Sequence, residues 1–217
     1  MSLNPKQQGI IPIAAFTANG NEDKLGVALN EGLDAGLTVN EIKETLIQMY
    51  AYCGFPRSLN GIFAFMSVLD ARKARGIEDE QGPDASPVSD NYDKDEYGAK
   101  MRASLGGQAE IPPPAAWQTF APTIDTFLKE HLFADIFVRD VLDHQARELA
   151  TVAALASMTG TEGQLIFHLG AAMNTGLSEA QMKDFVRVLK AKVGGEEGKR
   201  AMGVLEGVLK ARAPSQN

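Results

Sequence analysis

Residues 36–56 read GLTVNEIKETLIQMYAYCGFP, and this stretch decides the fold class. Thr38 and Glu41 have the spacing of a capping box, in which the hydroxyl accepts from the glutamate backbone amide and the glutamate side chain bonds back. Apolar residues then recur at helical spacing on one face: Ile42, Leu46 and Met49. Gly54-Phe-Pro56 ends the pattern, because proline disfavours an α conformation in the residue before it. The stretch therefore predicts one capped helix followed by a break.

The same order of signals recurs at an offset of 140 residues, as from Gly36 to Gly176. Ser178 and Gln181 form a second capping box, and Gly194 begins a second break. The offset also pairs further glycine and leucine positions: Gly20 with Gly160, Leu25 with Leu165, and Leu37 with Leu177. One gap-free offset that carries caps, breaks and core positions together indicates an internal duplication. We therefore expect an all-α fold in which a helical hairpin is built twice.

The chain between the two copies has a different composition. Residues 76–95 are acidic and rich in Gly, Pro, Ser and Asp, as expected of a solvated linker. From Trp117 onward, apolar residues share helical faces, and we expect them to be core: Phe120, Ile124, Phe127, Leu128, Phe133, Ile136 and Phe137. We predict a first repeat over residues 1–75, an acidic linker over 76–95 and a second repeat over 96–217.

Composition and charge narrow the class of function. The net charge of −7 over 217 residues disfavours binding to nucleic acid or to an anionic membrane surface. No apolar run approaches the about 20 residues of a membrane span, and the first residues lack the layout of a secretory signal, so we expect a cytoplasmic protein. Cys53 is the one cysteine, the three histidines are scattered, and no phosphate-binding glycine motif occurs. We therefore expect neither a metal nor another cofactor.

His168 is the leading candidate for chemistry. Apolar residues one turn away on either side indicate that it points inward: Leu165, Ala171 and Ala172. A partly buried imidazole can act as a general acid or base, and the alternative is a hydrogen-bonded core histidine with no such role. Glu148 is either a solvated residue or an acid-base group facing the His168 helix. Ala28 takes the position of His168 in the first repeat, so a site that uses His168 is asymmetric.

Two further groups of residues leave alternatives open. Arg139, Asp143 and Arg147 are spaced four apart, so they form either an exposed ion-pair ladder or, through one arginine, a clamp for a substrate carboxylate. Cys53 is either a buried structural thiol or a redox group. Its place at a helix end, where the dipole disfavours a thiolate, supports the structural interpretation.

These residues together resemble the pattern of the carboxymuconolactone decarboxylase family. The segment from Tyr52 to Pro56, with Asn60 after it, is similar to the family's helix break. Residues of the second repeat resemble the preceding part of the same pattern: Arg139, Arg147, His168 and Gly176. The resemblance covers most of residues 10–70 and about 90–210. It implies an all-helical, alkylhydroperoxidase D-like fold, assembly as a trimer or hexamer, and loss of carbon dioxide from a carboxylated muconolactone without a cofactor.

The sequence departs from that family in two ways. The family's thiol branch uses a CxxC shortly before a histidine, but Thr161 and Gln164 stand seven and four residues before His168, so the resemblance does not carry thiol peroxidase chemistry. The pattern is also split, because the second repeat has Val193 where the first has Cys53.

We therefore expect one composite site that draws on both repeats. His168 and Glu148 are its expected catalytic residues, and the expected substrate-binding residues are Arg139, Arg147, Tyr52, Cys53, Arg57 and Asn60. The favoured function is a cofactor-independent decarboxylase or related lyase that acts on a small carboxylated lactone. The alternatives are a thiol peroxidase and a non-catalytic oligomeric binding module.

Overall fold

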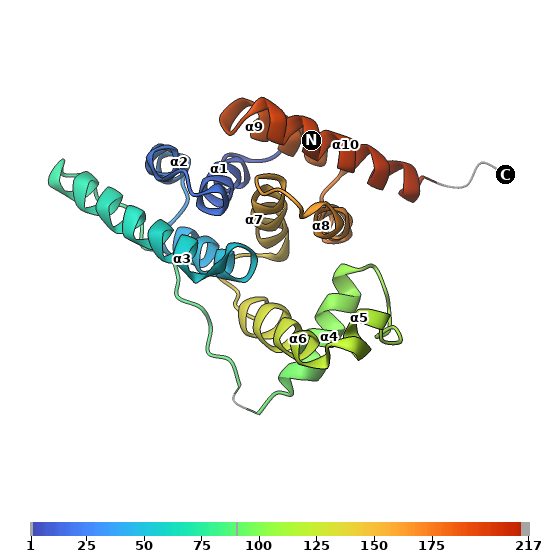
Figure 1. The fold of residues 1–217 in the computed structure, drawn as a ribbon. Coiled ribbons are helices and arrows are strands. Elements are labelled where there is room, and N and C mark those ends of the chain that lie inside the picture. The colour runs from blue at the N-terminus through green and yellow to red at the C-terminus, as the bar shows by residue number, and fades with distance from the viewer. Residues whose placement is uncertain (1, 90, 214–217) are drawn as a thin grey trace.

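The computed structural model describes residues 2–89 and 91–213. Within these ranges every regular element is a helix, which confirms the all-α fold (Figure 1). The first half of the chain contains α1 (Pro5–Asn19), α2 (Glu22–Asp34) and α3 (Val39–Ala74). The second half contains α7 (His144–Ala156), α8 (Glu162–Asn174), α9 (Glu179–Lys192) and α10 (Gly195–Arg212).

The helix bounds repeat at the offset that the sequence predicts. An offset of 140 residues places α2 on α8, residue for residue. Gly54 interrupts α3 with φ 81° and ψ 162°, and its counterpart Gly194 separates α9 from α10. Gly36 and Gly176 both have positive φ, 94° and 104°, at the same turn of the two halves. Both predicted capping boxes form at the starts of α3 and α9.

The core lies where α1 and α7 pack together. Every residue from Ile10 to Ala18 and from Ala146 to Ala156 is buried, so neither helix has a face that meets solvent over these stretches. A helix without a side that faces solvent is stable only when other helices surround it. Figure 1 shows this arrangement, with α2, α3 and α9 around the central pair, and α8 and α10 beside α7.

A smaller lobe lies between the two halves in sequence. It contains α4 (Lys94–Leu105), α5 (Ala116–Phe120), α6 (Pro122–Phe127) and a π-helical segment, η1 (Leu128–Ile136). The lobe contacts α8 through α4, and α3 through η1. The expectation that its apolar residues are all core is wrong for Phe120, Ile124 and Phe127, which are exposed, Phe120 by 91%. The helix is interrupted at Ala121 and Pro122, so the apolar positions before and after this interruption do not share one helical face.

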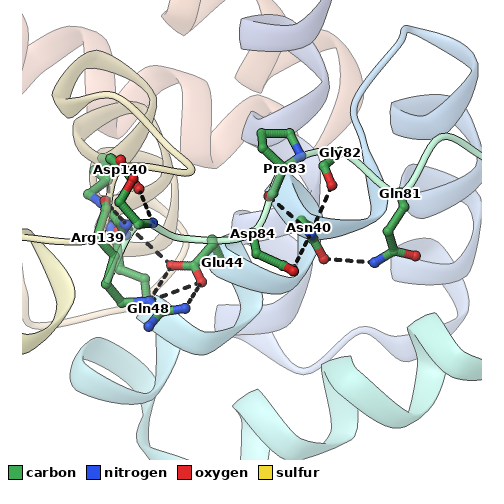
Figure 2. A network of polar contacts seen from close by, with 11 residues as sticks. Asn40, Glu44, Gln48, Gln81, Gly82, Pro83, Asp84, Arg139 and Asp140 are labelled. Atoms are coloured by element: carbon green, nitrogen blue, oxygen red, sulfur yellow. Dashed lines mark hydrogen bonds and ion pairs between the residues drawn. The ribbon is translucent and has the colours of Figure 1, made fainter. Parts of the chain in front are cut away.

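The acidic segment after α3 is extended, but part of it is bound to the protein and is not a free solvated linker. The first amides of α3 have no partner within their own helix, and linker carbonyls accept from them. The Val39 and Asn40 amides donate to the carbonyls of Glu80 and Gln81, at 2.9 and 3.0 Å. The Asn40 side-chain amide donates to two further linker carbonyls, and its oxygen accepts a hydrogen bond from the Gln81 side chain (Figure 2).

Candidate functional site

His168 and Glu148 form a buried pair between neighbouring helices. His168 lies in the middle of α8, on the buried face that it shares with Leu165 and Leu169, and Glu148 lies on α7 within the buried run from Ala146 to Ala156. His168 Nδ1 is 2.8 Å from Glu148 Oε2, and the two residues are 5% and 0% exposed. A buried carboxylate accepts from this nitrogen, which fixes the imidazole plane and leaves Nε2 as the nitrogen available to a ligand.

The pair carries unused hydrogen-bonding capacity. Glu148 Oε1 is buried and has no hydrogen-bond partner among the described residues. Buried polar atoms in proteins are nearly always bonded, so an unpaired carboxylate oxygen beside a histidine marks a place where a ligand or a water completes the arrangement.

Tyr52 brings the first half of the chain to the same place. Its ring meets the His168 ring edge to face, with 5.7 Å between the centroids and 82° between the planes. The Tyr52 hydroxyl is buried and, within the described ranges, has no hydrogen-bond partner; Thr151 lies nearby without meeting hydrogen-bond geometry. Burial, reinforced by the negative charge of Glu148, raises the pKa of Tyr52, so the phenol keeps its proton at neutral pH.

His168 and Tyr52 both line a cavity of about 700 Å³. The larger part of the lining is apolar: Trp117, Leu128, Leu132, Phe133, Leu155 and Phe167. The polar side chains in the lining are fewer: Tyr52, Arg102, Thr161, Gln164 and His168. The lobe of α4 to η1 supplies one wall and α8 supplies another, so the site combines both halves of the chain with the lobe between them.

Arg139 and Arg147 lie elsewhere, around Glu44 of α3, and Figure 2 shows Arg139 next to Glu44. Arg147 is 0% exposed, and its Nη2 donates to Glu44 at 3.2 Å, while Arg139 Nη2 donates to the same carboxylate at 2.6 Å. Gln48 completes the cluster by accepting from Arg147 and donating to its carbonyl. Burial alone would raise the pKa of Glu44, but its bonds to the two arginines outweigh this effect and lower it.

This ion cluster answers one of the open alternatives. Asp143 is not part of an exposed ladder, because its side chain caps the start of α7 by accepting from the Ala146 amide at 2.8 Å. Neither arginine lines the cavity, so a substrate-binding role for Arg139 and Arg147 stays a prediction that the cavity geometry does not support.

The remaining predicted residues also lie outside the cavity lining. Cys53 Sγ donates to the Met49 carbonyl at 3.1 Å, and burial raises the pKa of its thiol to about 11. Arg57 donates to the Ala18 carbonyl, and Asn60 bonds the side chain of Glu22 at the surface. Within residues 52–60, Tyr52 alone lines the cavity.

Sequence reasoning missed the contribution of the lobe. Arg102 and Trp117 line the cavity, and the Arg102 guanidinium lies over the Trp117 ring, 5.9 Å from its centroid. Neither residue belongs to a recognisable motif or to the repeated pattern, so nothing in the sequence distinguishes them from surface residues. Thr161 and Gln164, which stand where the thiol branch has cysteines, do line the cavity.

No group of three or more His, Cys, Asp or Glu side chains within residues 2–89 and 91–213 is arranged to hold a metal ion. None of the helices in these ranges has the length and apolar character needed to cross a membrane.

Comparison with known proteins gave one family. The model of the carboxymuconolactone decarboxylase family matches residues 1–65 and 122–207. The first matched segment contains Tyr52, and the second contains both Glu148 and His168. The residues between the segments include α4 and α5, which supply Arg102 and Trp117. Comparison with curated proteins gave no match.

Proposed function

Because the chain belongs to the carboxymuconolactone decarboxylase family, we propose that it is an enzyme that removes carbon dioxide from a small carboxylated lactone, or a closely related lyase. The observation that carries this proposal is the buried pair of His168 and Glu148, 2.8 Å apart, at a cavity that Tyr52 of the other half also lines. A positioned imidazole is the commonest proton-transfer group in enzymes, and this one is held by a carboxylate.

The reaction needs two things from the protein. When the bond between the lactone carbon and the carboxylate breaks, carbon dioxide leaves. The electron pair of the broken bond stays on the lactone carbon and spreads onto the lactone carbonyl. A hydrogen-bond donor at that oxygen stabilises the developing negative charge. The carbanion carbon then takes a proton, and the proton donor recovers one from water.

His168 fits the second task. With Nδ1 held by Glu148, Nε2 is the nitrogen left to face the ligand and to deliver a proton to the carbanion carbon. Tyr52 is assigned the first task, because it lines the cavity and its phenol keeps its proton. Its hydroxyl has no hydrogen-bond partner among the described residues but is closed to solvent, so the contact requires the ring to turn towards the ligand. In this proposal, His168 of the second half supplies the proton, and Tyr52 of the first half contacts the lactone carbonyl.

The experiment is to incubate the purified protein with carboxymuconolactone in D₂O and measure carbon dioxide release and deuterium in the product. We expect His168→Gln to lower the rate about 10²- to 10⁴-fold, as for loss of a general acid, and Glu148→Gln about 10- to 100-fold, as for loss of an orienting partner. His131→Gln is the control, because His131 is exposed, does not line the cavity and, among the described residues, hydrogen-bonds Asp135 alone. A wild-type protein that binds the lactone without releasing carbon dioxide would favour the binding-module alternative.

The thiol peroxidase alternative finds no support at the site. Cys53 is the one cysteine of the sequence and does not line the cavity, and burial raises the pKa of its thiol to about 11. A thiol with this pKa is almost wholly protonated at neutral pH, and the thiolate is the reactive form.

We also propose that the chain forms homo-oligomers through the outer face of α3. Four residues make an exposed apolar stripe there, each 45–64% exposed: Phe55, Leu59, Phe63 and Met66. The offset of 140 maps them onto exposed Gly195, Lys199, Gly203 and Glu206 of α10. The buried faces of α3 and α10 correspond at this offset, but an exposed apolar stripe is present only on α3 of these two helices. Two copies of one straight stripe can pair antiparallel about a two-fold axis, which makes a second copy the natural partner.

A further inference from the structure

We infer that the cavity at His168 accepts a larger and more apolar acid than carboxymuconolactone, and that Arg102 binds its carboxylate. Only one part of this inference rests on the proposed function, namely that the site that binds the acid also transforms it. It concerns what binds, and binding can be measured without turnover.

The size of the cavity is the first argument. Cavities of 300–1,000 Å³ typically enclose drug-sized ligands, and carboxymuconolactone has only about a dozen non-hydrogen atoms. At about 700 Å³, this cavity is near the middle of that range. A ligand as small as the lactone would leave much of the wall in contact with water.

The chemistry of the wall is the second argument. Leu128, Phe133 and Phe167 are among six large apolar side chains that line it. Apolar wall area stabilises a complex only when an apolar part of the ligand covers it. A lactone whose surface is mostly carboxylate and carbonyl oxygen offers no such part, whereas a ring system or an alkyl chain does.

Arg102 supplies the third argument. It is the one arginine or lysine among the described residues that line the cavity. Its Nη1 donates to Asp125 at 2.7 Å, and Asp125 is the one acceptor recorded for this guanidinium in the described ranges. Asp125 also accepts from Gln118 and lies 3.5 Å from Lys129, so its charge is shared between two cations. An arginine carries five donors, which leaves most of the Arg102 fork for a ligand.

The surroundings hold this fork in place. The Arg102 guanidinium lies over the Trp117 ring, 5.9 Å from the centroid, and such stacking restricts its plane. A planar guanidinium with free donors recognises a carboxylate with two parallel hydrogen bonds. Arg102 and Trp117 lie outside the residues that match the family model, so this carboxylate site belongs to the lobe of this chain.

Isothermal titration calorimetry with three probes tests the inference: 4-biphenylcarboxylate, its uncharged carboxamide, and benzoate. We expect 4-biphenylcarboxylate to bind wild-type protein at least about tenfold more tightly than either other probe, since a charge-assisted hydrogen bond contributes more than a neutral one. Arg102→Gln should abolish the difference between acid and carboxamide. Lys100→Gln, which removes an exposed lysine of the same helix paired with Glu96, should leave it unchanged.

Asp125→Asn guards against a purely structural effect. It breaks the same ion pair as Arg102→Gln but keeps the cation, so acid binding should be retained or strengthened. Equal binding of acid and carboxamide to wild-type protein, or acid binding that survives Arg102→Gln, would overturn the role of Arg102. Equal binding of benzoate, or no binding of any probe, would overturn the ligand class. Calorimetry measures binding without turnover, so a failure of the decarboxylase proposal would leave this result unchanged.

Discussion

The ion cluster around Glu44 leads to a quantitative prediction about stability. Glu44→Gln removes the negative charge but keeps the shape of the side chain and one oxygen acceptor. Arg147 is 0% exposed, so water cannot replace the lost partner, whereas Arg139 is 38% exposed at its side chain and can turn to solvent. Breaking a buried ion pair from one side typically costs about 3–5 kcal/mol. Because the amide oxygen of glutamine still accepts a hydrogen bond worth about 1 kcal/mol, we expect a loss near the lower end, about 3 kcal/mol.

Urea unfolding at neutral pH measures this loss, with Glu41→Gln as the matched control. Glu41 lies one turn earlier on α3, and its ion pair with Lys6, at 3.0 Å, is partly exposed. Glutamine at this position preserves the capping box, and an exposed pair contributes at most about 1 kcal/mol. A loss of about 3 kcal/mol also lowers the melting temperature by about 6–12 °C for a chain of this size. If Glu44→Gln costs no more than Glu41→Gln, the argument that Arg147 depends on a buried partner is refuted.

The pH dependence of the stability is an independent test of the Glu44 cluster. Burial alone would raise the pKa of Glu44, but the two arginines lower it from its ordinary value of 4.5. A carboxylate whose pKa is lower in the folded state stabilises the protein fully above the unfolded-state pKa, and the effect is lost as the pH falls through the folded-state value. The stability difference between wild type and Glu44→Gln should therefore be constant above about pH 5 and shrink in more acidic solution.

Cys53, the apolar stripe of α3 and Gly98 can each be tested by a single change. Alkylation of Cys53 should be slow at neutral pH and rise about tenfold per pH unit towards pH 11, because burial raises the pKa of its thiol to about 11; a midpoint near pH 8 would contradict this. Phe63→Glu should shift the mass measured by light scattering towards that of a single chain. Gly203→Glu adds the same charge at the equivalent position of α10 and should not shift the mass. Equal masses for the two variants would show that the α3 stripe is not the interface. Gly98→Ala should lower the stability measured by thermal unfolding by several kcal/mol, since the added Cβ would overlap the Lys129 carbonyl of η1. Gly26→Ala is the control and should be neutral or stabilising, because the space around Gly26 is open. A neutral Gly98→Ala would show that the lobe is loosely packed.

The repeated helices could be predicted because their signals are local. A cap such as Thr38 with Glu41, or a break such as Gly54, acts within a few residues, and its repetition 140 residues later makes each instance more certain. His168 could be placed inward for the same reason, because its own helix shows the apolar face.

Other features depend on contacts between distant parts of the chain, which helical spacing does not encode. The spacing of Arg139 and Arg147 looks like a surface ladder, but Glu44 from the other half makes it a buried cluster. Phe120 continues an apolar pattern, yet a break at Pro122 turns it to solvent. Arg102 and Trp117 line the cavity only because the lobe folds over α8, and neither residue has a local pattern that would have revealed this.

The central claim is that one site draws its working groups from both halves of the chain, and the rate of carbon dioxide release by Tyr52→Phe tests it most directly. This change removes only the Tyr52 hydroxyl, which has no hydrogen-bond partner among the described residues, and keeps the ring that meets His168. Tyr50→Phe is the control, since Tyr50 stacks on Phe55 and does not line the cavity. The account predicts that Tyr52→Phe lowers kcat about 10²-fold or more, the usual effect of losing a donor to a developing oxyanion, while Tyr50→Phe keeps the wild-type rate. If Tyr52→Phe turns over at the wild-type rate while His168→Gln is inactive, the second half alone makes the site and the composite account is wrong.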